Sequence, residues 1–239
     1  MAVFVLIAGA FHGAWCWERV TPLLEAQGHR ALAPDLPGMG ADKTPLASLS
    51  LAQWGRFGAE LLAGEREPVV LVGHSRGGKV ISQIAEYAPA HVRRLVYLTA
   101  TLPSLAPAEP HDPAKPLGRS DPSLVEFLPD GIAVSMRPQF VEPLFYNETP
   151  PEWLARAIAQ LGPEPIFGLA SGAEVTAENF GRVPKAYIEC LGDRALPNDI
   201  QRAAQRLARW EDVISLEGDH SPFYSRPEDL TAALVRAAG

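Results

Sequence analysis

A serine at the centre of the pentapeptide Gly73–Gly77 (Gly-His-Ser-Arg-Gly) is the first candidate for chemistry in this chain. The apolar run Val69–Val72 precedes it, and a helix-compatible stretch, Lys79–Tyr87, follows it. This order predicts a strand, a sharp turn and a helix, with the hydroxyl of Ser75 exposed at the end of a sheet. The pattern Gly-x-Ser-x-Gly is common by chance, and it is the flanking elements that make it specific here.

A serine hydroxyl is a weak nucleophile, so it needs a base and an acid that orients the base. Asp193 follows the predicted strand Lys185–Leu191, and His220 follows the predicted strand Asp212–Leu216. Functional side chains of parallel sheets lie beyond the carboxyl ends of the strands, so both residues are expected to meet Ser75 there. The chain order serine, aspartate, histidine is a known order for such a set.

Each of these candidates also has a plainer interpretation. Asp193 fits a simple Gly-Asp turn, and His220 fits an ordinary loop histidine. Asp219 is the alternative acid, but its place directly before His220 in the chain is poor for reaching the imidazole. The three residues together favour the catalytic interpretation.

Negative charge that develops on a substrate oxygen needs two backbone N–H donors aimed at one point. Arg76 follows the serine and supplies one donor, and the loop Ala8–Phe11 is the expected source of the other. The side chain of Arg76 is expected to reach solvent or to pair with an acidic residue of the lid described below, and it is given no catalytic role.

Apolar strands alternate with helical patterns along most of the chain, which predicts an α/β fold with a mostly parallel sheet covered on both faces. Pro22 should lie near the start of the first helix or kink it. Strands are predicted over Ala2–Ile7, His29–Ala33, Val69–Val72, Leu95–Thr99, Lys185–Leu191 and Asp212–Leu216. Helices are predicted over Ala14–Gln27, Leu51–Ala63, Lys79–Tyr87, Asp199–Ala208 and Pro227–Ala238.

The alternation breaks in the middle of the chain, where residues 101–166 hold thirteen of the 23 prolines. The stretch is also rich in large aromatic residues, in which a disordered linker would be poor. We therefore expect one domain over residues 1–239 with an ordered cap or lid insertion at about 101–175. Short helices are expected in it, the best candidate being Pro151–Leu161.

Composition excludes several classes of protein. The 239 residues are 47% hydrophobic with a net charge of −7 and no basic run, which argues against nucleic-acid partners. Two isolated cysteines indicate reduced thiols in a cytoplasmic protein, and no Cys/His spacing indicates a metal. Met1–Ile7 fits a buried strand better than a signal peptide, and no apolar run approaches the ~18 residues of a membrane span.

Five motifs give the chain a resemblance to the plant methylesterase and hydroxynitrile lyase group of α/β-hydrolases, and to related small bacterial esterases. They are Phe4–Trp17, Pro34–Gly38, Gly73–Gly77, Tyr187–Pro197 and Gly218–Pro227. The resemblance implies an α/β-hydrolase fold with helices on both faces of the sheet and an inserted lid over a mostly apolar pocket. It also implies a triad of Ser75, His220 and Asp193, oxyanion N–H groups from Ala10 and Arg76, no cofactor, and a homodimer as one oligomeric state.

Three departures from the family bear on the reaction. Ala8 stands where the family usually has histidine, which leaves the geometry of the adjacent loop open. The lyases have threonine at the position of Gly9 and lysine at the position of Ser221. Because both lyase-type groups are missing, the esterase branch is favoured.

The expected activity is hydrolysis of a small apolar or aromatic carboxylic ester through an acyl-enzyme on Ser75. The alternatives are a carbamate, lactone or amide hydrolase on the same triad, a C–C lyase like the hydroxynitrile lyases, and a non-catalytic ligand receptor on a hydrolase fold. Candidate pocket residues are Gly9, His12, Phe127, Phe145, Trp153 and Ser221.

Overall fold

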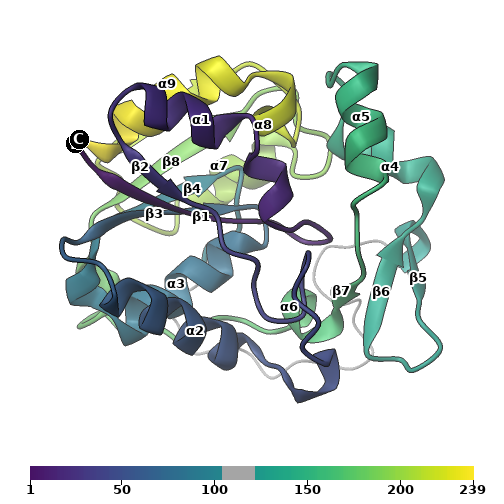
Figure 1. The fold of residues 1–239 in the computed structure, drawn as a ribbon, viewed down its shortest axis with the longest axis horizontal. Coiled ribbons are helices and arrows are strands. Elements are labelled where there is room, and N and C mark those ends of the chain that lie inside the picture. Colours follow the sequence, from purple (N-terminus) through teal and green to yellow (C-terminus); the bar gives the residue numbers. More distant parts are fainter. Residues whose placement is uncertain (104–121) are drawn as a thin grey trace.

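A computed structural model describes residues 1–103 and 122–239 (Figure 1). The start of the predicted lid, with the prolines between 104 and 121, lies outside the described residues. A six-stranded sheet has the order β2-β1-β3-β4-β8-β9, and every pairing in it is parallel. Its strands are β1 (Val3–Ile7), β2 (Arg30–Leu32), β3 (Val69–His74), β4 (Val92–Leu98), β8 (Lys185–Cys190) and β9 (Asp212–Leu216).

Helices cover both faces of this sheet, which confirms the predicted α/β fold (Figure 1). Alternate residues of the strands enter two separate apolar cores. Leu6 of β1 packs with α1 (Val20–Ala26) and α9 (Pro227–Ala238), whereas Ile7 packs with α2 (Leu51–Ala63) and α3 (Gly77–Tyr87). Two shorter helices, α7 (Asn198–Gln205) and α8 (Pro222–Ser225), follow β8 and β9.

Local chemistry explains where the helices begin. The hydroxyl of Ser50 accepts the N–H of Gln53 at 3.3 Å and caps α2. The predicted helix Ala14–Gln27 forms as a 3₁₀ turn, Ala14–Trp17, followed by α1. Pro22 lies in the first turn of α1, where its missing N–H costs no intrahelical bond, as expected.

The segment between β4 and β8, called the insertion below (described residues 122–184), contains a second sheet. Its antiparallel order is β5-β6-β7. Its elements are β5 (Val125–Phe127), β6 (Ala133–Met136), α4 (Pro138–Phe145), α5 (Pro151–Ile158), β7 (Glu164–Pro165) and α6 (Ile166–Ala170). Short helices were expected there, but the sheet was not, because strands of two to four residues leave no readable alternation.

The insertion lies beyond the carboxyl end of β1, where the loops that bear the candidate site residues also lie (Figure 1).

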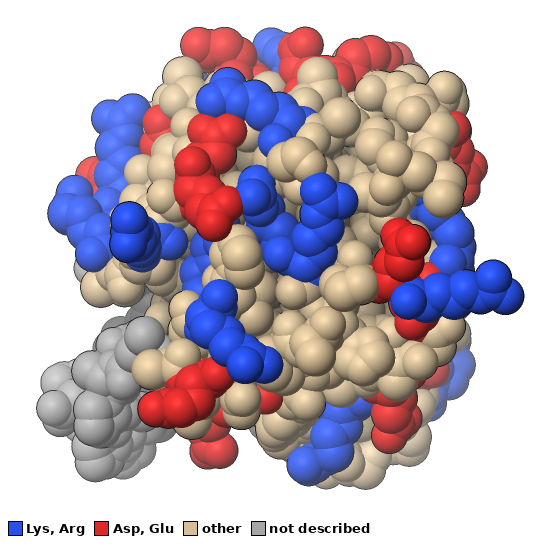
Figure 2. Space-filling view, turned by 90° about the vertical axis from the view of Figure 1, so that its left-hand side faces the viewer, with Lys and Arg blue, Asp and Glu red and all other residues tan. Residues whose placement is uncertain are grey.

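On the face at the left of Figure 1, acidic and basic side chains are interspersed (Figure 2). None of the helices in the described part of the chain is long and apolar enough to cross a membrane.

Candidate active site

Ser75 lies on the turn between β3 and α3, as the motif predicts. Its φ angle of 52° is in the left-handed region that side chains rarely adopt. The turn is tight, because a methyl group added at Gly73 would lie 2.6 Å from the carbonyl oxygen of Gly77. The carbonyl of Ser75 accepts the N–H groups of Gly78 and Thr101 at 3.0 and 3.2 Å, so the strained turn is held from both sides.

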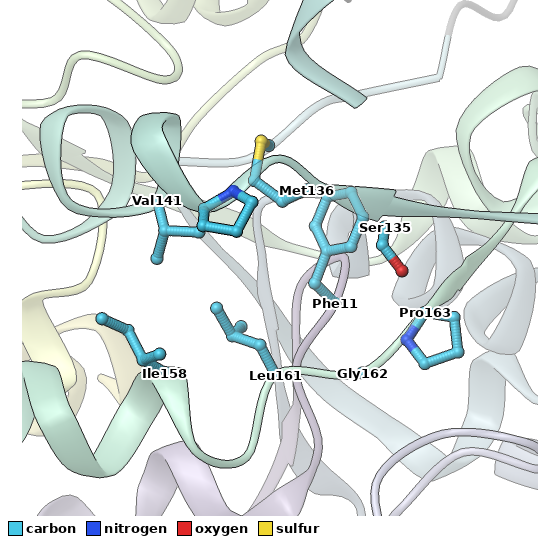
Figure 3. A pocket seen from close by; sticks show the side chains of 9 residues that line it. Phe11, Ser135, Met136, Val141, Ile158, Leu161, Gly162 and Pro163 are labelled. Carbon is cyan, nitrogen blue, oxygen red and sulfur yellow. The ribbon is translucent and has the colours of Figure 1, made fainter. Parts of the chain in front are cut away.

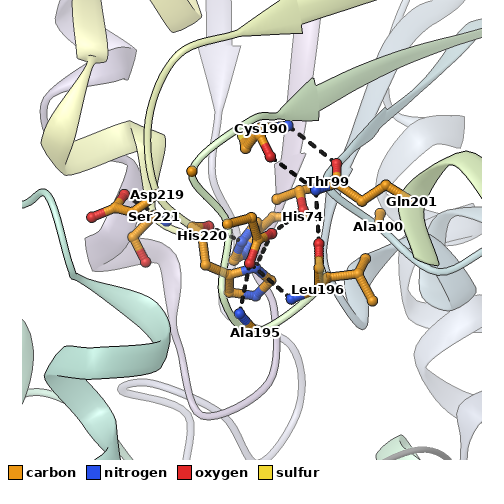
Figure 4. Close-up of polar contacts among 12 residues, drawn as sticks. His74, Thr99, Ala100, Cys190, Ala195, Leu196, Gln201, Asp219, His220 and Ser221 are labelled. Carbon is orange, nitrogen blue, oxygen red and sulfur yellow. Dashed lines mark hydrogen bonds and ion pairs between the residues drawn. The ribbon is translucent and has the colours of Figure 1, made fainter. Parts of the chain in front are cut away.

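Asp193 and His220 meet beyond the ends of β8 and β9. Nδ1 of His220 lies 2.7 Å from Oδ2 of Asp193, and their side chains are 4% and 0% exposed. The other carboxylate oxygen accepts the N–H groups of Ala195 and Leu196, both at 2.8 Å, and the hydroxyl of Thr99 donates to Oδ2 (Figure 4). The acid is therefore fixed, and His220 must donate through Nδ1, which leaves Nε2 free to accept a proton.

His74 holds the backbone of His220 in place. Its Nε2 donates to the carbonyl of His220 at 2.8 Å, and the two rings lie 4.7 Å apart. Burial and the neighbouring His220 keep the pKa of His74 well below its usual value. His74 is therefore neutral and adds no charge beside the candidate base.

Asp219, the alternative acid, contacts other partners. One of its oxygens accepts the N–H of Glu148 at 3.0 Å and the hydroxyl of Thr149 at 2.9 Å. The other accepts the N–H of Ser221 at 3.0 Å and the hydroxyl of Ser225 at 2.7 Å. Asp219 thus joins the His220 loop to the insertion, and the carboxylate that reaches the imidazole is that of Asp193.

The two predicted oxyanion donors are both free within the described residues. The backbone N–H groups of Ala10 and Arg76 donate to no protein acceptor there. Ser75 Oγ and Nε2 of His220 are not hydrogen-bonded to each other in this structure, and such contacts between nucleophile and base are often long until a substrate binds. The oxyanion role of Ala10 and Arg76 stays a prediction.

The side chain of Arg76 is buried rather than exposed to solvent. Its Nε lies 2.9 Å from Oε1 of Glu164 in β7, and the two side chains are 4% and 0% exposed. This is the alternative in which Arg76 pairs with an acid of the insertion. Sequence reasoning missed Glu164, for which the only signal is its place between two prolines in an otherwise uncharged stretch.

His12 is buried beside the loop Ala8–Phe11, called the oxyanion loop below, and is neutral. Burial lowers its pKa to about 3. Nδ1 donates to the carbonyl of Ala10 at 2.6 Å, so Nε2 accepts the hydroxyl of Tyr146, also at 2.6 Å. His12 therefore fixes a peptide of the loop and links it to the insertion.

An apolar cavity of about 230 Å³ opens beside Phe11, between the oxyanion loop and the insertion (Figure 3). The ring of Phe145 stacks on His220 at 5.5 Å and lies 6.1 Å from the ring of Phe11. The cavity is thus two rings away from the candidate base. It is lined by Phe11, Ser135, Met136, Pro138, Val141, Ile158, Leu161, Gly162 and Pro163.

The predicted pocket residues lie in several places. Phe145 lies against His220, whereas Phe127 is 53% exposed on β5, and Trp153 packs against Tyr224 and Arg19. Ser221 is buried, and its hydroxyl has no hydrogen-bond partner in the described residues. In residues 1–103 and 122–239, no group of three or more His, Cys, Asp or Glu side chains could hold a metal ion.

Comparison with known proteins places this fold and site in a family. The sequence profile of the alpha/beta hydrolase family matches residues 4–234, and the chain belongs to that family. Methylesterase 1 of Arabidopsis thaliana is 32% identical over 98% of this chain and 95% of its own length. A pyrethroid hydrolase of Sphingobium wenxiniae is 33% identical over 97% of this chain and 85% of its own length.

A solved structure gives the same result for the fold. The crystal structure of polyneuridine aldehyde esterase superposes with a TM-score of 0.87 and 26% identity, and covers all of both chains. These relatives support the esterase class for this chain. The resemblance to the methylesterase group of α/β-hydrolases is confirmed.

Proposed function

We propose that this esterase cleaves small apolar or aromatic carboxylic esters through an acyl-enzyme on Ser75. The proposal rests on the buried 2.7 Å contact between His220 and Asp193, beyond the strands of the same sheet whose strand β3 ends in the strained turn of Ser75. A base whose tautomer is fixed by a buried carboxylate is what a serine nucleophile requires.

In the proposed reaction, Nε2 of His220 takes the proton of Ser75 as Oγ attacks the ester carbon. The N–H groups of Ala10 and Arg76 stabilise the oxyanion, and loss of one such donor costs about 10²- to 10³-fold in kcat. His220 then gives the proton to the leaving alcohol. Water repeats the sequence on the acyl-enzyme and releases the acid.

The apolar cavity supports the choice of substrate. Side chains of Phe11, Met136, Val141, Ile158 and Leu161 line it, and no charged side chain does. Ser75 and His220 do not line this cavity, so it supports the apolar class of substrate and not a particular binding pose; an apolar group buried there would gain about 25 cal/mol per Å² of apolar surface. Relatives named methylesterase, methyl jasmonate esterase and pyrethroid hydrolase support esters of this kind.

Gly9 favours hydrolysis over lyase chemistry. A methyl group added at Gly9 would lie 2.6 Å from Nδ1 of His74, so the threonine of the lyases does not fit here without displacing His74.

The cytoplasmic location also stays a proposal, and it is supported by two buried free cysteines, Cys16 and Cys190.

Substitution of the nucleophile tests the proposal. Ser75→Ala should lower kcat for a short aryl ester by roughly 10⁵- to 10⁶-fold, because triad members act as a unit. A fluorophosphonate should add covalently to Ser75 in the wild type and in the control Ser48→Ala. Near-normal ester turnover by Ser75→Ala would refute the mechanism. A panel of ester, carbamate, lactone and amide substrates, with mandelonitrile for lyase activity, would separate the alternatives.

A further inference from the structure

The buried ion pair of Arg76 and Glu164 has no part in the proposed proton transfers. Arg76 follows the nucleophile, whereas Glu164 belongs to the insertion. The guanidinium also lies 4.5 Å above the ring of Trp54 in α2. Two charges buried this deeply need good geometry to offset their desolvation. The other contacts of Arg76 and Glu164 show which part of the site the ion pair holds.

The Arg76 side chain holds the peptide that contains one of the proposed oxyanion donors. Its Nη2 donates to the carbonyl of Gly9 at 2.9 Å. In a trans peptide the C=O and the following N–H point in opposite directions. The contact therefore turns the N–H of Ala10 away from the guanidinium and fixes its direction.

Glu164 holds the next peptide of the same loop. Its Oε2 accepts the N–H of Phe11 at 3.0 Å, while the carbonyl at the other end of that peptide, on Ala10, accepts His12. The carbonyl of Phe11 accepts the N–H of Gly162 at 2.9 Å, two residues before Glu164. Phe11 has a φ angle of 66°, and a non-glycine residue stays in this region only where several contacts hold it.

We propose that Arg76 and Glu164 are positioning residues that aim the Ala10 N–H at the substrate oxyanion, so that the insertion sets the geometry of the oxyanion hole. The inference rests on the proposed function, because it assumes an oxyanion at Ser75. Arg76 then serves the hole twice, with its own backbone N–H and by orienting the other donor. The guanidinium contacts the Gly9 carbonyl and the Glu164 carboxylate at the same time because its donors form a planar fork.

The plainer explanation is that the ion pair only stabilises the fold. A change of substrate chemistry separates this explanation from the positioning role. A thionoester places sulfur, a weaker hydrogen-bond acceptor, where an ester places oxygen. Its hydrolysis gains less from the oxyanion hole, so the ratio of ester to thionoester kcat reports the hole itself. A general loss of folded protein lowers both rates equally.

Arg76→Lys is the main test, because lysine keeps the charge beside Glu164 but lacks the fork. We expect kcat for p-nitrophenyl acetate to fall about 10²-fold, the loss that one oxyanion donor brings, with little change in KM. The rate with the thiono analogue should fall much less, so that the ratio drops at least about tenfold. A wild-type ester rate, or an equal fall of both rates, would overturn the positioning role.

The double variant Arg76→Met/Glu164→Gln repeats the test without leaving a buried charge unpaired, and thermal unfolding checks that it folds. The ratio should drop here too, and a preserved ratio would count against the proposal. Arg236→Met/Asp212→Asn, which removes the more exposed ion pair at the start of β9, controls for the loss of an ion pair away from the site, and it should keep the wild-type ratio. If Ser75→Ala keeps its turnover, the proposed function fails. If Ser75→Ala is inactive and Arg76→Lys keeps the wild-type ratio, only the positioning role fails.

Discussion

Replacement of Asp193 by asparagine should move the imidazole hydrogen of His220 from Nδ1 to Nε2. Oδ1 of Asp193 accepts two backbone N–H groups, from Ala195 and Leu196. The amide oxygen of an asparagine must therefore take the place of Oδ1, and its NH₂ group must take the place of Oδ2. This NH₂ faces Nδ1 of His220, which can then only accept.

The hydrogen of the imidazole moves to Nε2 as a result, and the base facing Ser75 is lost. With side chains only 4% and 0% exposed, water does not offer His220 an alternative partner. We expect a loss of about 10⁴-fold in kcat, or about 5.5 kcal/mol at the transition state. Initial rates with an aryl ester at pH 7 measure it.

Asp219→Asn is the informative comparison. Each oxygen of Asp219 accepts one backbone N–H, from Glu148 or from Ser221. An asparagine therefore leaves one donor unpaired in either orientation, the buried N–H of Ser221 or the part-buried N–H of Glu148, at a cost of up to about 1–3 kcal/mol of stability. Its kcat should change less than about tenfold. A larger loss of activity in Asp219→Asn than in Asp193→Asn would refute this reasoning.

Two further predictions concern packing and pH. Gly9→Thr should lower the free energy of unfolding by about 1–3 kcal/mol and reduce ester turnover, because its Cβ would meet Nδ1 of His74 at 2.6 Å; an unchanged melting temperature would contradict this. Burial depresses the pKa of His12 from 6.5 to about 3, so the unfolded chain takes up a proton that the folded chain refuses. Stability is then fully present above pH 6.5 and falls as pH drops from there toward 3, by about 1.4 kcal/mol per unit for this group. Chemical denaturation at several pH values should show a smaller slope in His12→Gln, and an identical slope would count against the assignment.

The sequence predicted best what depends on the order of the elements. Ser75, Asp193 and His220 follow three strands of one parallel sheet, so their place beyond its carboxyl edge follows from topology, and the structure shows His220 and Asp193 in contact there. Thr99, at the end of β4, could have been added by the same logic, because β4 pairs with β8. The sheet order itself was left open, because pairing depends on contacts that no single segment encodes.

Contacts between distant segments were beyond reach. His74 meets the carbonyl of a residue 146 positions later, and nothing in its own neighbourhood predicts that contact. The Glu164 contact with Phe11 spans 153 positions, and β7, in which Glu164 lies, has only two residues. Burial of an ion pair depends on how the insertion packs, and the sequence around Glu164 shows no helical or strand period.

The hydrogen bonds of Asp219 limit how this enzyme could be re-engineered. Exchanging the insertion for that of a relative is an obvious route to new specificity, but Thr149 and the N–H of Glu148 would leave with it. Without equivalent donors, a chimaera would contain a fully buried carboxylate with half of its partners, directly before His220. A transplanted insertion should therefore bring matching donors, or be combined with a neutral residue at position 219, before its substrate range can be judged.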